Sequence, residues 1–400
     1  MGMRILVVDE NEARLQAIRR AFWQKHRNWE VLLALGADEA FQILARDPVD
    51  VLIAGQHPPG LDGAELLQRV RQSHPGIVRI LMADGALADQ AERAEGDLHR
   101  LVLEPMEPRA LISMVESLDT EDDEDTVRAI RTAVGGLGRL PSLPSLYSEL
   151  VALLEREDAG MKEVARLVHR DLGIASQVLK LANSAHFAAG RSVTELGQAV
   201  AMLGVDSLRS LVLFRGIISG CPSSRPAGLD LEQLWFHSFE VAVGARKLAL
   251  LEGEARLADM AFSVGLLHDI GLLVFAMDPQ GRYQATLEQA RLSRVPLAVL
   301  EHATYGMDHA QLGAHLLNLW GLPPAFSKPV REHHAPSVPG DGFPLSLALH
   351  MADAKHGGGK MAGIFADGRW GLHPNVFTNP ARYAHWKACL TAEEPGSAEA

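Results

Sequence analysis

An adjacent histidine and aspartate, His268 and Asp269, lie inside the apolar run AFSVGLLHDIGLLVFAM at residues 261–277. An imidazole or a carboxylate that stays unpaired in apolar surroundings costs several kcal/mol, so each must be hydrogen-bonded or bound to a cation. Imidazole and carboxylate ligands together suit Fe, Mn or Zn. The pair therefore predicts a metal site, provided that other segments of the chain supply further ligands.

The length and composition of the chain favour a globular protein with more than one domain. A chain of 400 residues exceeds the usual size of a single domain, so two or three compact units are expected. The formal net charge is -12 and no basic tract is present. This balance disfavours binding to nucleic acid, which depends on clustered Lys and Arg side chains that neutralise phosphates.

Several features favour a cytoplasmic protein that does not enter a membrane. The first residues, MGMRILVVDENE, lack the basic start, the apolar segment and the cleavage site of an export signal. Cys221 and Cys389 are the two cysteines, a number that fits a reducing compartment. The longest apolar run, residues 265–277, is interrupted by His268 and Asp269 and falls short of the roughly 20 residues of a membrane span.

The first 118 residues alternate between apolar, β-branched segments and segments with helical periodicity. This alternation predicts a doubly wound parallel α/β sheet, whose ligand site lies at the carboxyl ends of the strands. Strands are expected over 3–9, 30–34, 49–54, 78–82 and 101–103, and helices over 11–26, 38–45, 63–72, 88–94 and 108–117.

The same segment resembles the receiver domain of two-component response regulators over its whole length. The matching blocks are ILVVDE, PPGLDGAELL, VRILMADG and LVLEPMEP, in the order and spacing of that family. The resemblance implies a flavodoxin-like fold. It also implies a site in which an acidic pair holds Mg²⁺ and an aspartate at the end of the third strand accepts a phosphoryl group.

The acidic pair of the receiver family is present as Asp9 and Glu10, but the phosphoacceptor is lost. The acceptor position, seven residues before Asp62, is Gly55. A glycine has no nucleophile, so phosphoryl transfer to this position cannot occur.

Two further receiver positions agree with this loss. The position of the family's hydroxyl residue is Ala83, and the position of its lysine is Glu104, which reverses the charge beside the phosphate site. We therefore expect a pseudo-receiver that is retained for dimerisation or docking. The alternative is that Asp62 or Asp84 serves as a displaced acceptor.

The remaining chain divides into a linker, a helical domain and an extension. Residues 119–135 begin with the acidic run DTEDDEDT, which is self-repelling and marks a domain boundary. Residues 136–355 have helical periodicity throughout and predict an all-α bundle. Residues 356–400 are rich in glycine and turn formers, with a helical candidate at 380–390 and an end expected to be disordered.

The helical region resembles the HDOD domain, a relative of the HD phosphohydrolase superfamily. The blocks that carry the resemblance include LPSLPSLYSEL, EVARLVHRDLGIASQVLKLANSAHF, LWFHS, GLLHDIG, DHAQLGAHLLNLWGLP and EHH, in the family's order. The resemblance implies an HD-type helical bundle. A receiver followed by an HDOD domain is also a recurring arrangement in bacterial signalling.

Metal-dependent HD enzymes, including the HD-GYP phosphodiesterases of cyclic di-GMP, use His and Asp ligands from separate helices to hold two or three cations that activate a water. The resemblance implies seven such ligands in this chain. They are His237, His268, Asp269, His309, His333, His334 and Asp353.

Two departures from the enzymes argue against catalysis. The enzymes carry a lysine just after the HD motif, where this chain has Leu272, and a glutamate four residues before the first histidine, where it has Gln233. Loss of the lysine removes a cation that would stabilise the transferring phosphoryl group. Hydrogen bonds inside the bundle are the alternative explanation for the histidines. His302, His315 and His350 match no ligand position and are interpreted as supporting or surface residues.

The sequence thus favours a non-catalytic signalling protein in which a phosphorylation-incompetent receiver regulates or docks an HDOD output domain. Its expected cofactor is a divalent metal, Fe, Mn or Zn. Signalling proteins such as a histidine kinase or diguanylate-signalling proteins are its expected partners, and a homodimer is compatible with the receiver. One alternative is a metal-dependent phosphodiesterase acting on cyclic di-GMP or another nucleotide. Another is a sensor that binds a nucleotide and hydrolyses nothing.

Overall fold

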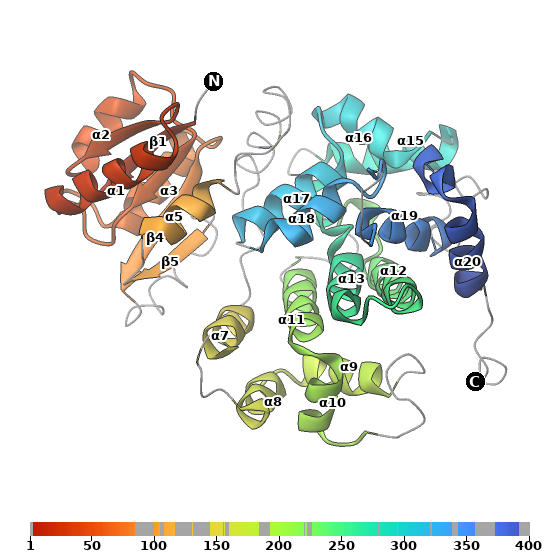
Figure 1. Ribbon diagram of the computed structural model, residues 1–400. Helices are drawn as coiled ribbons and strands as arrows, with labels where there is room; N and C mark the ends of the chain where they lie inside the picture. Colours follow the sequence, from red (N-terminus) through yellow and green to blue (C-terminus); the bar gives the residue numbers. More distant parts are fainter. Residues whose placement is uncertain are drawn as a thin grey trace.

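A computed structural model shows an α/β part followed by a helical part (Figure 1). The residues that the structure describes are 3–84, 100–104, 108–116, 130, 145–154, 156, 160–183, 193–219, 221, 226–278, 281–293, 295–320, 322–337, 343–356 and 373–391.

The α/β part contains a five-stranded parallel sheet with strand order β2-β1-β3-β4-β5. This order is that of doubly wound, flavodoxin-like folds, as predicted. The strands are β1 (Arg4–Val8), β2 (Glu30–Ala34), β3 (Val51–Ala54), β4 (Val78–Asp84) and β5 (Arg100–Glu104).

Helices cover both faces of the sheet, because neighbouring strand residues point to opposite faces. Ile5 and Val7 belong to one apolar cluster, with residues of α1 and α5, whereas Leu6 and Val8 belong to another, with residues of α2 and α3. The helix predicted over 88–94 lies outside the described residues. The described helices are α1 (Glu12–Lys25), α2 (Ala37–Leu44), α3 (Gly63–Ser73) and α5 (Pro108–Glu116).

In the described residues that follow, all regular elements are helices, which confirms the predicted all-α class (Figure 1). The first group is α7 (Ser145–Leu154), α8 (Met161–His169), α9 (Leu172–Ala182), α10 (Leu196–Leu203) and α11 (Val205–Ser219). The second is η2 (Pro226–Gly228), α12 (Leu231–Leu251), α13 (Ala255–Leu267), α14 (Ile270–Ala276), α15 (Arg282–Ser293), α16 (Leu297–Tyr305), α17 (His309–Leu319), α18 (Pro324–Arg331) and α19 (Leu345–His356).

Two glycines allow the helices around the His268–Asp269 pair to approach closely. A Cβ atom on Gly265 would lie 2.5 Å from Cα of Ala242 in α12, and one on Gly271 would lie 2.1 Å from the carbonyl oxygen of His309 in α17. Real Cβ atoms do not make such contacts, so only glycine permits these two backbone approaches. Both bring ligand-bearing helices toward the pair.

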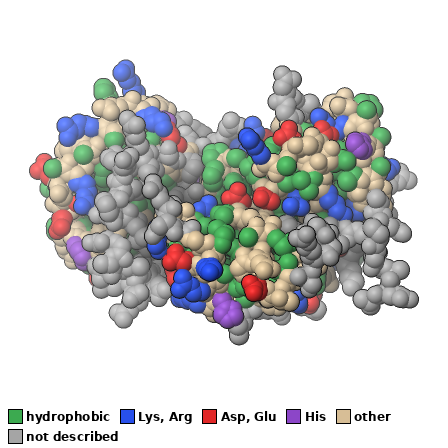
Figure 2. Space-filling model, turned by 60° about the horizontal axis from the view of Figure 1, so that its bottom comes forward, with side chains coloured by type: hydrophobic (Ala, Val, Ile, Leu, Met, Phe, Trp, Pro, Cys, Tyr) green, Lys and Arg blue, Asp and Glu red, His purple; other side chains and the backbone are tan. Residues whose placement is uncertain are grey.

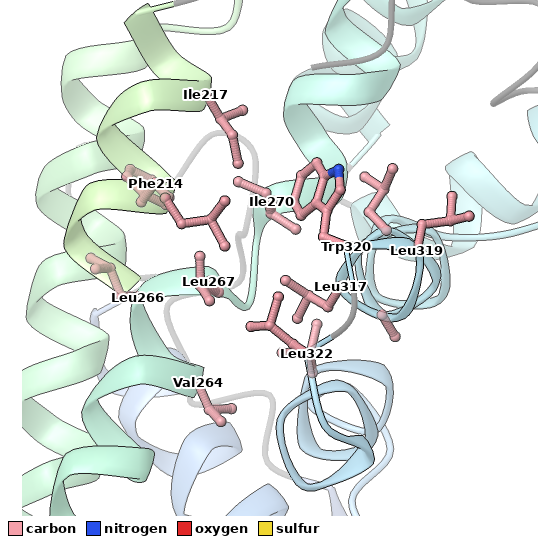
Figure 3. Packing of buried hydrophobic residues seen from close by; sticks show 14 of the residues in the cluster. Phe214, Ile217, Val264, Leu266, Leu267, Ile270, Leu317, Leu319, Trp320 and Leu322 are labelled. Carbon is pink, nitrogen blue, oxygen red and sulfur yellow. The ribbon is translucent and has the colours of Figure 1, made fainter. Parts of the chain in front are cut away.

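The residues directly before and after the His268–Asp269 pair are packed in the apolar core (Figure 3). Leu267 and Ile270 flank the pair, and both are fully buried among side chains of α11 and α17 that include Phe214 and Leu317. Trp320, 6% exposed, ends α17 and packs into the same cluster. Because these neighbours are fixed, the polar pair between them has little freedom to turn toward solvent.

The helical stretch Ala255–Ala276, which covers α13 and α14, is long and apolar enough to cross a membrane by length and composition. This stretch begins ten residues before the apolar run 265–277, which by itself is shorter than a membrane span. However, 83% of its most apolar window is buried inside the protein, and a core helix passes the same test.

The C-terminal extension contributes a helix, α20 (Pro380–Thr391), which confirms the helical candidate predicted there. It follows the short 3-10 helix η3 (Pro374–Thr378). Trp386 and Leu390 of α20 are buried against Leu248 of α12 and Met351 of α19. The rest of the extension and, apart from residue 130, the linker at 119–135 lie outside the described residues, so the domain boundaries remain predictions.

Charged side chains of both signs are interspersed on the molecular face in Figure 2. The described residues on that face form no continuous basic surface.

Candidate metal centre

The structure brings together all seven side chains that the sequence indicated as metal ligands. They come from the ends and inner faces of five helical segments. His237 lies on α12, His268 and Asp269 lie between α13 and α14, His309 begins α17, His333 and His334 follow α18, and Asp353 lies on α19.

Asp269 occupies the middle of this group, and its two carboxylate oxygens face different histidines. Its Oδ2 lies 3.4 Å from Nε2 of His237 and 3.2 Å from Nε2 of His268. Its Oδ1 lies 3.4 Å from Nε2 of His309 and 3.8 Å from Nε2 of His333. Asp269 is therefore placed to bridge two ligand groups.

Each of the two groups could hold one ion. In the first group, which we call site 1, ligand atoms of His237, His268 and Asp353 all lie within 4.8 Å of one another. Oδ1 of Asp353 is 3.2 Å from Nε2 of His237. The second group, site 2, is formed in the same way by His309, His333 and His334.

The histidine rings are oriented by bonds on their outer nitrogens. Nδ1 of His268 lies 2.7 Å from the carbonyl oxygen of Gly265, and Nδ1 of His333 lies 2.6 Å from that of Val330. A carbonyl can only accept, so in both rings Nδ1 carries the proton and donates it. Whenever such a ring is neutral, as in a metal-bound state, its lone pair is therefore on Nε2, the nitrogen that faces Asp269.

Several buried atoms in the centre have no hydrogen-bond partner among the described residues. They are Nε2 of His268, Nε2 of His333, both carboxylate oxygens of Asp269 and Oδ1 of Asp353. Buried polar atoms without a partner are rare in folded proteins. All five converge on the same two sites, so this donor set fits divalent metal ions with nitrogen and oxygen ligands.

The buried charges of the centre shift one another's pKa values. Burial alone would lower the pKa of His237 and His268, but the nearby carboxylates of Asp269 and Asp353 more than offset it and raise these pKa values to about 9 and about 10. Burial would raise the pKa of Asp269, but His268, His237 and His309 hold it well below its usual range. Burial would likewise raise the pKa of Asp353, but His237 and His268 hold it well below its usual range, so both aspartates are kept ionised, as metal ligands must be.

One supporting residue, Glu301 on α16, was missed by the sequence analysis. Its carboxylate is fully buried and lies 2.5 Å from Nδ1 of His309 and 2.9 Å from the backbone nitrogen of the same residue. Its other oxygen accepts a hydrogen bond from the hydroxyl of Tyr283 at 2.6 Å. An acid eight residues before His309 was the available signal, since helix 297–305 is otherwise largely apolar on its buried side.

In the α/β part, protein groups bind the carboxylate of Asp9, the first residue of the predicted Mg²⁺-binding pair. Asp9 is 3% exposed, and its Oδ1 accepts from the backbone N–H of Asn11 at 2.8 Å while its Oδ2 accepts from Nη1 of Arg14 at 3.1 Å. A Cβ atom on Gly55 would lie 2.6 Å from this Oδ2. The carboxylate of Asp9 therefore fills space that an acceptor side chain at position 55 would need.

Comparisons with known proteins agree with this division of the chain. A family model of the response regulator receiver domain matches residues 5–116, and a family model of the HDOD domain matches residues 140–336. The chain carries a receiver domain followed by an HDOD domain. This architecture supports a signalling protein with an HD-related output domain.

Individual relatives match parts of the chain. An uncharacterized protein of Treponema pallidum is 28% identical over 51% of this chain and 40% of its own length. The hydrogenase transcriptional regulatory protein HoxA of Cupriavidus necator is 36% identical over 27% of this chain and 22% of its own length. The chain thus spans less than half the length of either relative.

The fold is also found in a solved HDOD domain protein of unknown function from Geobacter sulfurreducens. That structure has a TM-score of 0.53 and 22% identity, and the match covers 68% of this chain and 91% of the solved one. At this identity the likeness shows the fold alone.

The receiver domain places its other predicted residues as follows. Glu10 and Asp62 are exposed, and the carboxylate of Asp62 caps α3 by accepting from the backbone N–H of Ala64 at 2.7 Å. Ala83 is buried on β4. Asp84 and Glu104 are partners in the backbone register of β4 and β5.

In the HDOD domain, the two positions at which this chain differs from the metal-dependent HD enzymes lie as follows. Leu272 is fully buried in α14 as part of the apolar core, and Gln233 lies in the first turn of α12. Of the histidines expected to be supporting or surface residues, His302 is exposed, His315 is buried on α17, and His350 contacts His333.

Proposed function

We propose that this protein is a cytoplasmic bacterial signalling protein in which a phosphorylation-incompetent receiver regulates or docks an HDOD domain that contains a two-ion metal centre. The bridging position of Asp269 is the observation that carries the metal centre. Its two oxygens face two separate ligand groups, and neither has a hydrogen-bond donor among the described residues. Fe, Mn and Zn suit the nitrogen and oxygen ligands.

The receiver supports a role in docking rather than in phosphorelay. Position 55 offers no acceptor, and Arg14 neutralises the carboxylate of Asp9 on which Mg²⁺ would depend. The carboxylate of Asp62, the alternative acceptor, already caps α3, which argues against that role. Other signalling proteins or a second copy of the chain are the partners that such a receiver suits.

The residues around the metal centre support a non-catalytic output. Divalent ions bound in such a centre supply a Lewis acid that polarises phosphoryl oxygens. Turnover also needs groups that stabilise the charge on the transferring phosphoryl group. Leu272 offers no charge and is buried in the core, where the related enzymes carry a lysine.

A second candidate function is a metal-dependent phosphodiesterase that acts on cyclic di-GMP or another nucleotide. The complete set of seven candidate ligands favours it, because both ligand groups and their bridge are present. A sensor that binds a nucleotide at the centre without hydrolysing it is compatible with the same geometry.

Metal analysis of the purified protein tests the proposal. We expect close to two ions of Fe, Mn or Zn per chain in the wild type, and none in the double variant His268→Ala with Asp269→Ala. The exposed His302→Ala is the matched control and should keep both ions. A wild type that binds none of the three metals would remove the proposed centre.

Two activity measurements separate the candidates. The metal-loaded protein is incubated with cyclic di-GMP, and we expect no turnover; metal-dependent hydrolysis that the double variant loses would establish the phosphodiesterase instead. The receiver is incubated with acetyl phosphate and Mg²⁺, and we expect no stable labelling. Labelling of the receiver that Asp62→Asn abolishes would show a displaced acceptor.

A further inference from the structure

The C-terminal segment His373–Thr391 lies beyond the residues matched to the HDOD domain, yet it contacts the segments that carry the candidate ligands. It packs on α12, which bears His237, and on α19, which bears Asp353. One hydrogen bond joins it directly to residues 333–336, the segment that bears the double histidine, and His350 of α19 links it to the same segment indirectly.

His350 on α19 connects this segment to site 2. Its Nδ1 lies 2.6 Å from the carbonyl oxygen of His333, and its Nε2 accepts from the backbone N–H of His373 at 2.8 Å. The carbonyl can only accept and the backbone N–H can only donate. His350 must therefore be the tautomer with a proton on Nδ1, and both of its nitrogens are used.

Asn375 of η3 makes a second connection. Its side-chain amide donates to the carbonyl oxygen of Pro336 at 2.7 Å, and its backbone N–H lies 3.3 Å from Nδ1 of His373. His333 and Pro336 lie beyond the end of α18 at Arg331, so their carbonyl groups take no part in the hydrogen bonds of that helix. The carbonyl of Pro336 thus accepts from the C-terminal segment itself. The carbonyl of His333 accepts from His350, whose other nitrogen is held by that segment.

The segment is itself firmly attached to the HDOD domain. Trp386 is fully buried, and its indole N–H donates to Glu252 at the end of α12 at 2.7 Å. Arg382 donates to both carboxylate oxygens of Glu252, at 3.1 and 3.2 Å. A segment held in this way can fix the position of what it contacts.

From these contacts we infer that the C-terminal segment, acting through His350 and Asn375, positions the His333–His334 pair for metal binding at site 2. His350 is a positioning residue, since it contacts the backbone of His333 rather than an ion. The inference rests on the proposed two-ion centre. Supporting residues of this kind commonly change metal affinity by 10- to 100-fold.

Titration of the full-length protein with Mn²⁺ and with Zn²⁺ tests this inference. The variant His350→Leu removes both hydrogen bonds at similar volume, and Asn375→Ala removes the second connection without touching the buried core. We expect each variant to bind one ion at site 1 as tightly as the wild type, and the second ion about 10- to 100-fold more weakly. His385→Leu, an exposed histidine on α20, is the control and should match the wild type.

Thermal unfolding of the metal-free variants is measured in parallel, because a purely structural role would lower stability without separating the two ions. If His350→Leu does not fold, Asn375→Ala carries the test alone. Two ions bound by the variants with wild-type affinities, or equal weakening of both ions together with lower stability, would overturn the inference while leaving the metal centre intact. A wild type that binds no metal would instead overturn the proposed centre and this inference with it.

Discussion

Two buried aspartates among the described residues, Asp9 in the receiver domain and Asp269 in the HDOD domain, differ in what surrounds them. In the receiver, both oxygens of Asp9 accept hydrogen bonds, from Asn11 and Arg14. In the HDOD domain, neither oxygen of Asp269 has a donor among the described residues, although histidine nitrogens lie 3.2 to 3.8 Å away.

In the proposed function, bound cations compensate Asp269, whereas protein donors compensate Asp9. A buried carboxylate must be compensated, either by protein donors or by a cation. Arg14 supplies that compensation to Asp9 without a cation. No equivalent Lys or Arg lies on Asp269 among the described residues, and the neighbouring histidines can compensate it only by holding protons.

Matched substitutions of the two aspartates should give the largest contrast. Asp269→Asn keeps the shape of the side chain but removes the bridging charge, so we expect affinity for both ions to fall by roughly 100-fold or more, beyond the 10- to 100-fold typical of supporting residues. Asp9→Asn should leave metal binding by the HDOD domain unchanged. Metal content and calorimetric titration of both variants provide the measurement, and equal effects of the two changes would refute the contrast.

Metal should also stabilise the two domains differently. At an ion concentration 100 times its Kd, binding to the folded state alone adds about 2.7 kcal/mol to the free energy of unfolding. We expect Mn²⁺ or Zn²⁺ to stabilise the HDOD domain by this order and a chelator to reverse the gain. Mg²⁺ should leave the unfolding of the receiver unchanged, because Arg14 already pairs with Asp9. Denaturant unfolding, followed by a probe in each domain, measures both effects.

Substitution of Glu301 should distinguish the two ion sites of the centre, because the candidate ligand that Glu301 contacts, His309, belongs to site 2. Glu301→Gln removes the charge that holds the ring of His309, so we expect affinity for the ion at site 2 to fall about 10- to 100-fold while site 1 is unchanged. Tyr283→Phe, which removes only the hydroxyl contact to Glu301, should have a smaller effect in the same direction. Titration resolved into two binding steps is the measurement, and loss at site 1 alone would contradict the assignment.

The parts that the sequence predicted are those with a local or motif-level signal. A continuous apolar run that includes Ile5 and Leu6 indicated a strand covered on both faces, and the strand order agrees with the receiver resemblance. The ligand candidates could be selected because His268 and Asp269 are polar residues in an apolar run. The structure brings all seven together, while metal binding itself stays a prediction.

The parts that were missed depend on contacts between distant segments. Glu301 is one acid among many in the sequence, and only the fold places its carboxylate on the ring of His309. His350 and His373 are 23 residues apart, and Asn375 and Pro336 are 39 apart, so no periodicity relates them. Similarly, nothing in the receiver motif indicates that Arg14 pairs with Asp9.

The smallest change in phosphorylation is expected when the acceptor that the receiver lacks is restored. In Gly55→Asp the new Cβ would lie 2.6 Å from Oδ2 of Asp9, so the side chain would have to displace a carboxylate of the same charge that is held by Arg14. We expect a loss of about 1 to 3 kcal/mol in the stability of the receiver and no stable labelling by acetyl phosphate. Gly55→Ala is the control, because it adds the same Cβ without charge and separates crowding from repulsion. Efficient labelling of Gly55→Asp would show that the site is merely missing its acceptor, and that the pairing of Asp9 with Arg14 does not close it.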